Sequence, residues 1–427
     1  MSAWKPWRGF WPLAAVLFCG TVLNLSTAQE PPAPAGRNAE EITPPPGLRP
    51  FQHALFMSTR RAAEWLWNAN RADGTFLPGL RPDLDAEVED DLLRQIQGAY
   101  GLARSARFFA SERYAVRARQ AILSLLTMTR TDPQDASVRF TVPPSSQTNR
   151  LGAAALLVLA IHELPEPGAD LLEQADQLAN FLKKQQRKDG SFAVSDDGEE
   201  SAASPADAAV YSANAILALA RSSGRQAEPG RMAAARNGFT AAFRAWKENR
   251  LPHATCVLIC AGAELHARTG DKALSENVCE LADWLCTLQY PPDPRRPAWQ
   301  GGFRTSPSKA GGEVEPAADS ALCIEAVCEA CRVVRAGADL QRFGRYRDAG
   351  ERGFQFLTTL QYGPANTKHF APWYGPRLYG AFHDSPRDGT IRLENTQRCL
   401  CALTAYFQYV IQAEPGSRGV DRPSDGD

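Results

Sequence analysis

The pattern of apolar and polar positions predicts two kinds of α-helix that alternate along the chain. One kind is apolar on nearly every side, as in residues 151–161 (LGAAALLVLAI), 208–220 and 254–263. The other is amphipathic and charged, as at Glu173-Gln174-Ala175-Asp176. A helix that is apolar all round belongs in an interior layer, whereas an amphipathic helix turns one face to solvent. The sequence therefore predicts an all-α fold with an inner and an outer layer of helices.

Four segments share a repeated motif at the end of a predicted outer helix. Each has an aromatic residue followed by leucine, an amide four residues after the leucine, and then glycine and phenylalanine two residues apart. Glycine can turn the chain out of the helix, and the phenylalanine can fold the loop back onto the core. The amide, glycine and phenylalanine of the four copies are Asn70, Gly74 and Phe76; Gln186, Gly190 and Phe192; Gln289, Gly301 and Phe303; and Gln361, Gly380 and Phe382.

The spacing of these copies predicts the number of helices. A polar residue 15 or 16 positions after each phenylalanine begins the next apolar helix, so each copy is a helical hairpin. The 116 and 111 residues between the first three glycines leave room for two unmarked hairpins. These pair about 113–128 with 147–163 and about 230–247 with 252–269. Six hairpins, or about twelve helices, predict an (α/α)6 toroid, with an open solenoid as the alternative.

The chain ends are predicted to lie outside this folded body. Lys5 and Arg8 precede an apolar run of about 14 residues, which is typical of a secretory signal peptide and short for a membrane span. We expect a signal peptide over 1–28 with cleavage near Ala28, and export to the periplasm or the extracellular space. Residues 29–50 form a Pro-rich tether, 51–413 the toroid and 414–427 a polar tail. The mature chain is expected to contain no integral membrane span.

Charge and cysteine content exclude several classes of function. Lys and Arg total 47 and Asp and Glu total 48, so no basic excess indicates a nucleic acid partner. Nine of ten cysteines follow the predicted leader, and most lie in apolar helical runs. We interpret them as small buried side chains, with disulfides or a metal site as the alternative. No Cys-x-x-Cys pair accompanies nearby histidine, so we expect no metal and no other cofactor.

The segment Gln186-x-x-Asp189-Gly190-Ser191-Phe192 resembles the repeat of the terpenoid cyclase and protein prenyltransferase superfamily. That resemblance implies an (α/α)6 toroid, in agreement with the helix count. The catalytic motifs of the superfamily are missing. Asp319 is followed by Ser320-Ala321-Leu322-Cys323, which does not form the Asp-x-Cys zinc motif, and 85–91 does not supply Asp-x-Asp-Asp. The Cys-Gly-Glu-Gln thioester motif of related toroids is also absent. The resemblance therefore implies the fold of an exported member without these activities.

The N-termini of the inner helices are expected to converge at one mouth of the ring, where backbone N–H groups favour polar or negative ligands. The candidate catalytic residues there are Asp207, Tyr211, His253, Asp319 and Glu394. The polar residues Gln95, Asn149 and Asn395 are expected in the same region. The candidate ligand-binding residues, including three from the long loop after Gln361, are Arg94, Arg150, Trp373, Tyr374, Arg377 and Arg398. Alternative roles are helix capping for Asp91, Asp207 and Asp319, and an i,i+4 pair between Glu394 and Arg398.

Two main hypotheses of function follow. The first is an exported polysaccharide-processing enzyme that binds a small-molecule or oligosaccharide ligand at the mouth. A hydrolase needs two facing carboxylates, such as Asp207 and Asp319, and a lyase needs Tyr211 or His253 as a base beside an arginine. The second is a non-catalytic ligand-binding or scaffold toroid with a protein partner. A degenerate terpenoid cyclase-like enzyme ranks third.

Overall fold

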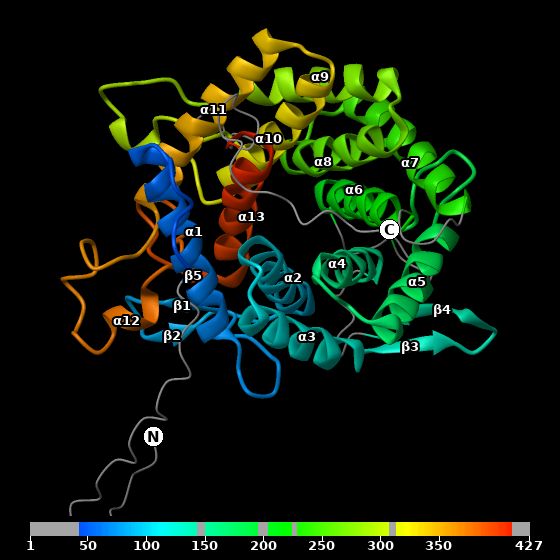
Figure 1. The fold of residues 1–427 in the computed structure, drawn as a ribbon, viewed down its shortest axis with the longest axis horizontal. Helices are drawn as coiled ribbons and strands as arrows, with labels where there is room; N and C mark the ends of the chain where they lie inside the picture. Colours follow the sequence, from blue (N-terminus) through cyan, green and yellow to red (C-terminus); the bar gives the residue numbers. More distant parts are fainter. Residues whose placement is uncertain (1–41, 143–149, 195–203, 224–228, 307–312, 412–427) are drawn as a thin grey trace, which may run out of the picture. The chain divides into compact units, whose positions relative to one another are not determined.

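The computed structural model describes residues 42–142, 150–194, 204–223, 229–306 and 313–411. Twelve long helices in these ranges form six consecutive pairs (Figure 1). The first helices of the pairs are α1 (Pro50–Ala69), α3 (Glu112–Leu126), α5 (Ala169–Lys184), α7 (Pro229–Glu248), α9 (Lys272–Cys286) and α11 (Leu340–Thr359). The second helices are α2 (Leu92–Phe109), α4 (Arg150–Glu163), α6 (Pro205–Ser222), α8 (Pro252–Thr269), α10 (Ser320–Ala336) and α13 (Leu393–Tyr409).

The second helices form a closed inner ring. Each packs against the next in the order α2, α4, α6, α8, α10 and α13, and α13 returns to pack against α2. The first helices surround this ring (Figure 1). Burial agrees with the predicted layers, because α4 is buried at nearly every position whereas α5 buries one side. The prediction of an (α/α)6 toroid with six hairpins is confirmed, and the open solenoid is excluded by the contact between α13 and α2.

The repeated motif has a shared structural role at the turn from an outer to an inner helix. In each copy the amide side chain donates to the carbonyl oxygen of the motif glycine, at 3.0–3.1 Å. The amide residue and the phenylalanine also pair as an isolated β-bridge. All four glycines have positive φ, between 84° and 96°, a region that other residues rarely adopt. The motif is therefore a requirement of the turn geometry.

The same motif joins neighbouring outer helices. Gln186 donates to the carbonyl of Ala234 in α7, and Gln289 donates to that of Ala349 in α11, both at 2.8 Å. Gln361, at the end of α11, donates to the carbonyl of Ser58 in α1 at 3.0 Å. The last outer helix, α11, is thus joined to the first, α1, by the same kind of amide-to-carbonyl hydrogen bond that joins α5 to α7 and α9 to α11. The outer ring therefore also closes.

Short strands, which the sequence analysis did not predict, lie in the connections. Strands β3 (Thr129–Asp132) and β4 (Asp135–Thr141) form a hairpin that packs on α5. Strand β1 (Gly79–Arg81) lies between β2 (Ala86–Glu87) and β5 (Ile391–Arg392), so the loop after α1 pairs with the residues before α13. The remaining elements are a 3₁₀ turn, Pro297–Trp299, and the one-turn helix α12 (Gly375–Leu378).

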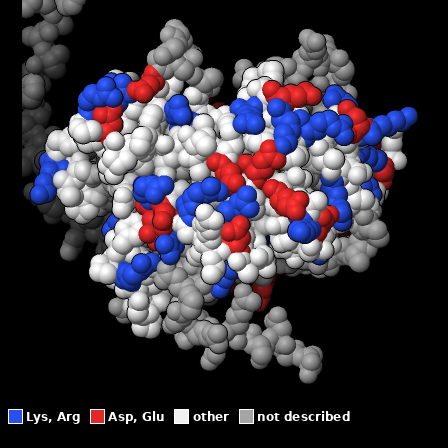
Figure 2. Space-filling model, turned by 90° about the horizontal axis from the view of Figure 1, so that it is seen from above, with Lys and Arg blue, Asp and Glu red and all other residues white. Residues whose placement is uncertain are grey.

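Acidic and basic side chains are interspersed on the face shown in Figure 2, in keeping with the net charge of −1. No helix within the described ranges is long and apolar enough to cross a membrane. Eight of the nine described cysteines are buried, and Cys286 is half-buried. The predicted signal peptide, the tail and most of the tether (29–41) lie outside the described residues, and helix α1 begins at Pro50.

Candidate functional site

Three inner helices bring His253, Asp319 and Arg398 together at one mouth of the ring. Each residue lies at or near the start of its helix, α8, α10 and α13, and these helices are neighbours in the ring. Asp319 occupies the N-cap position of α10 but makes no capping hydrogen bond with its side chain. One carboxylate oxygen instead accepts from Arg398, and the other lies 3.1 Å from His253 Nε2. The capping role predicted for Asp319 is therefore wrong.

The charge of Asp319 is fixed by these partners. Burial alone would raise the pKa of Asp319, but Arg398 and His253 outweigh burial and hold this pKa well below its usual range. Asp319 is thus ionised at neutral pH and cannot donate a proton there. His253 Nε2 lies 3.1 Å from the carboxylate, so the imidazole ring and Asp319 are close neighbours at the mouth. Asp319 therefore helps to fix the position of the His253 ring.

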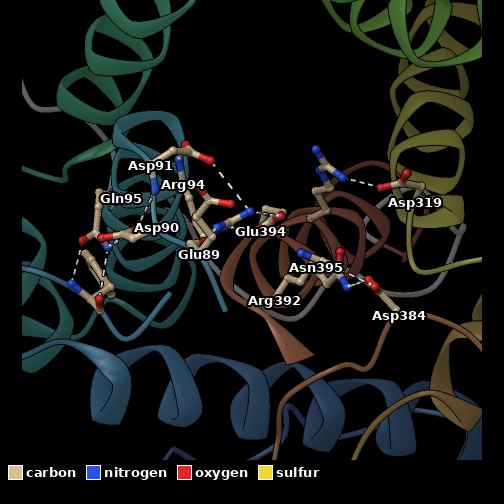
Figure 3. Close-up of polar contacts among 12 residues, drawn as sticks. Glu89, Asp90, Asp91, Arg94, Gln95, Asp319, Asp384, Arg392, Glu394 and Asn395 are labelled. Carbon is tan, nitrogen blue, oxygen red and sulfur yellow. Dashed lines mark hydrogen bonds and ion pairs between the residues drawn. The ribbon is translucent and has the colours of Figure 1, made fainter. Parts of the chain in front are cut away.

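A second ion pair lies on the other side of α13 (Figure 3). Arg94 of α2 binds both oxygens of Glu394, with Nε–Oε2 at 2.6 Å and Nη2–Oε1 at 3.1 Å. Both side chains are nearly buried, with exposed fractions of 12% and 13%. The alternative pairing of Glu394 with Arg398 is wrong, because each residue binds a different neighbouring helix. Glu394 is occupied by this bidentate pair, which ties α13 to α2.

Asp91, Asp207 and Tyr211 lie on another part of the mouth. Asp91 caps α2 as expected, accepting from Arg94 N at 2.8 Å. Asp207 does not begin α6, because Ser204 is the N-cap and donates its hydroxyl to Asp207 at 2.7 Å. Burial, Asp207 and Asp91 raise the pKa of Tyr211, which makes Tyr211 a weaker candidate for a base at neutral pH. Within the described ranges, these residues make no hydrogen bond or ion pair with Asp319.

The predicted residues of the long loop form a separate patch. Trp373 is 65% exposed and packs edge-on against the buried Tyr374. The Arg377 guanidinium lies 5.1 Å from the Tyr374 ring and 3.4 Å from an oxygen of Asp85. The contacts of these described residues do not reach His253 or Arg398, so the loop is not part of the same cluster.

Three further candidates from the sequence, Arg150, Gln95 and Asn395, each contact a neighbouring residue of the fold. The Arg150 guanidinium lies over the ring of Phe140, 5.4 Å from its centroid. Gln95 accepts from the backbone N–H of Phe76 at 2.7 Å and donates to its carbonyl at 3.0 Å, which holds the first repeat loop. Asn395 donates to Asp384 at 2.6 Å (Figure 3). Asn149 lies outside the described residues.

A small cavity of 90 Å³ lies on the axis of the ring, because all six inner helices contribute to its lining. Arg398 lines this cavity and also binds Asp319, so the cavity begins at the mouth cluster. Arg221 also lines the cavity, and it lies 3.2 Å from both the Tyr100 hydroxyl and a Glu163 oxygen. This buried network closes the far end of the axis.

Glu325 is a functional candidate that the sequence analysis missed. It lines the axial cavity from α10, six residues after Asp319. Burial raises the pKa of Glu325 to about 7, while Arg104 lowers it and Glu329 raises it further. A carboxyl group with this pKa is half protonated at neutral pH and can act as an acid or a base. The available signal was an acidic residue inside the apolar run SALCIEAVC.

The described residues offer no group of three or more His, Cys, Asp or Glu side chains that could hold a metal ion. No protein-family model matches the chain, and no curated protein matches it in sequence. Several solved structures share its architecture. The fold is that of the α/α-toroid enzymes.

D-mannose isomerase superposes with a TM-score of 0.61 at 12% identity, over 84% of this chain and all of that structure. An unsaturated glucuronyl hydrolase specific for heparin gives a TM-score of 0.58 at 14% identity, over 83% and 97%. An inactive variant of the α-1,6-mannanase GH76A of Salegentibacter sp. HEL1_6, in complex with α-1,6-mannotriose, gives 0.57 at 10% identity, over 82% and 98%.

These similarities correct the resemblance to the terpenoid cyclase and prenyltransferase superfamily, which is wrong. The solved structures are α/α-toroid enzymes named for sugars. The reason for the error is visible in the turns. A glycine with positive φ and an amide that reaches its carbonyl satisfy the geometry of the outer-to-inner turn, so the motif carries no information about chemistry.

Proposed function

We propose that the protein is a polysaccharide-processing enzyme that binds an acidic saccharide at the mouth of the toroid and acts on it by proton transfer. The observation that carries this proposal is the cluster of His253, Asp319 and Arg398 at the entrance of an axial cavity lined by Glu325. The solved structures of similar fold support a saccharide substrate, because they are named for heparin, mannose and α-1,6-mannotriose. The acidic character of the substrate is inferred from Arg398.

The proposed roles follow from the charges of these groups. His253 Nδ1 accepts the proton on the carbon beside a uronate carboxylate, and Asp319 stabilises the imidazolium that forms. Arg398 faces the uronate carboxylate and balances the developing negative charge. The electron pair left on carbon forms a C=C bond as the glycosidic C–O bond breaks, and Glu325 protonates the departing oxygen. This is the reaction of a lyase.

A lyase fits the site better than a hydrolase built on Asp207 and Asp319. Asp319 is held in an ion pair and Asp207 is exposed at the start of α6. A hydrolase also needs one carboxyl group that is protonated at neutral pH. Glu325 meets that requirement and Asp319 does not.

The test is turnover of acidic polysaccharides, followed by the ultraviolet absorbance of the unsaturated product. We expect His253→Ala to lower kcat by about 10²–10⁴-fold. His266→Ala, a histidine change near the other end of α8, is the matched control and should retain full activity. Equal activity of His253→Ala and the native protein would remove His253 from the mechanism. Product without a new double bond would show hydrolysis.

A second candidate function is a ligand-binding toroid without catalysis. One observation favours it, because the axial cavity of 90 Å³ is smaller than the 300–1,000 Å³ of most ligand sites. This candidate predicts that acidic oligosaccharides raise the melting temperature without forming any product. Arg398→Ala should abolish that stabilisation. Turnover of any saccharide by the native chain would exclude the candidate.

We also propose export, with the signal peptide, tether, toroid and tail bounded as the sequence predicts. The support is the leader-like sequence 1–28, which lies outside the described residues. N-terminal sequencing of chain recovered outside the cytoplasm should begin near Gln29. Recovery with Met1 intact would contradict cleavage.

A further inference from the structure

A second and larger cavity, of 680 Å³, lies in the wall of the toroid between α6, α7 and α8. Helix α7 belongs to the outer ring, and α6 and α8 are neighbours in the inner ring. None of the residues assigned above to saccharide chemistry lines this cavity. Its volume falls within the 300–1,000 Å³ range of small-molecule sites.

The wall cavity is lined mainly by apolar side chains on all three helices, with the hydroxyl groups of Ser212 on α6 and Thr255 on α8. Alanine side chains occupy the positions where the helices face one another, and they leave the space between the helices open. Water gains few hydrogen bonds from such walls, so an apolar molecule is the better occupant. The lining alanines are Ala208, Ala209, Ala213, Ala241, Ala242, Ala245 and Ala254.

The cationic Arg187 of the lining favours an occupant that accepts hydrogen bonds. Trp246 lines the cavity and is 4% exposed, and its indole N–H has no hydrogen-bond partner among the described residues. Its ring is held by stacking on Phe243 at 5.7 Å and by an edge contact with Trp284 at 5.8 Å. Arg187 and Asn249 also line the cavity and are exposed to solvent.

The hydrogen-bond donors of the cavity lining have no acidic side chain beside them among the described lining residues. No aspartate or glutamate among the described residues lines the cavity. The indole of Trp246 and the guanidinium of Arg187 can only donate. An ionised carboxylate can only accept, and it carries the charge that Arg187 would balance. The lining therefore combines a mainly apolar chamber with a cationic side chain, Arg187, and with hydroxyl and amide groups that can also donate.

We propose that the wall cavity binds a single-chain carboxylic acid, with the alkyl chain among the alanines and the carboxylate toward the donor groups. Arg187 and Asn249 hold the carboxylate where the cavity meets solvent. The inference is independent of saccharide processing at the mouth, since it uses different residues. A fatty acid bound there would stabilise the contact between α7 and the inner ring.

Dodecanoate is the probe, added to the full mature chain below its micelle-forming concentration. Binding is measured by isothermal titration calorimetry and by the shift in melting temperature. Two substitutions from opposite walls fill the cavity, Ala242→Phe on α7 and Ala209→Leu on α6. Each should weaken binding at least tenfold while the variant still unfolds cooperatively. Ala233→Phe, at an exposed position of α7, is the matched control and should bind like the native chain.

The head group is tested separately. Arg187→Gln should weaken dodecanoate binding several-fold and leave methyl dodecanoate unaffected, because the ester carries no charge. Absence of binding by the native chain, or unchanged binding in both filled variants, would overturn the proposal. Equal weakening of the acid and its ester by Arg187→Gln would overturn the assignment of the carboxylate. Saccharide turnover should be the same in the filled variants, which separates this test from that of the mouth.

Discussion

Glu325 links the stability of the toroid to the proposed chemistry, and the substitution Glu325→Gln tests both. Burial raises the pKa of this carboxyl from its ordinary 4.5 to about 7. Between these values the folded protein keeps a proton that the unfolded chain has released, so the folded state binds more protons. The free energy of unfolding must then fall as pH rises through this interval. Glutamine has nearly the same shape and stays neutral.

The size of the effect follows from the pKa difference. Each unit corresponds to about 1.4 kcal/mol, so the charged Glu325 lowers the free energy of unfolding by about 3 kcal/mol at pH 8. Glu325→Gln should recover about that amount at pH 8. At pH 4, where Glu325 is protonated in both states, the substitution should change little. The mutant is therefore expected to be more stable than the native protein only at higher pH.

Urea unfolding followed by circular dichroism at a series of pH values measures this difference. Glu276→Gln is the matched control, because Glu276 is 69% exposed and its nearest cation, Lys272, is 3.9 Å away. That control should stay within about 0.5 kcal/mol of the native protein at every pH. A Glu325→Gln protein that is less stable at pH 8, or equally shifted at all pH values, would refute the argument. Saccharide turnover by Glu325→Gln should fall even though stability rises.

Two further predictions concern closure of the ring and its charges. Gln361→Ala removes donors to the carbonyls of Gly380 and Ser58 and should lower the free energy of unfolding by about 2–4 kcal/mol in urea. Asn70→Ala, whose amide bonds only its own loop, should lose about half as much, and equal losses would contradict a role in closure. Asp319 has a lowered pKa, so its contribution to stability is present above its usual pKa and is lost as pH falls through its folded pKa. Asp319→Asn should therefore be less stable by about 2 kcal/mol at neutral pH and approach the native protein in acid, measured by unfolding at both pH values.

The fold could be predicted because each marked turn from an outer to an inner helix requires the same residue types in the same order. Gly74, Gly190, Gly301 and Gly380 must adopt positive φ, and their spacing counts the hairpins. The unmarked hairpins followed from the length of chain between them. The β3–β4 hairpin could not be predicted, because its stability comes from packing on α5, where the Phe140 and Phe181 rings lie 6.3 Å apart. A short strand supported by tertiary contacts leaves little trace in local periodicity.

The sequence predicted individual residues of the candidate site, but not which of them pair with one another. His253, Asp319 and Arg398 were each expected at the mouth, because each lies at the start of an apolar helix. Local spacing suggested a pair between Glu394 and Arg398, one helical turn apart. Contacts between neighbouring helices override that spacing in the folded ring. Glu325 was missed because a single acid in an apolar helix shows its role only when the axial cavity is known.

Helix α13 explains why assembly of the site depends on closure of the ring. It is the last inner helix, and it reaches α10 through Arg398 and α2 through Glu394. The residues of the Arg94–Glu394 pair are 300 positions apart, so this pair forms only when the last inner helix lies against the first. Arg398 is carried by the same helix and is fixed by Asp319 on the opposite side. The charged cluster at the mouth is therefore a product of ring closure, and a fragment that lacks α13 would keep His253 and Asp319 but lose the arginine that holds the carboxylate ionised.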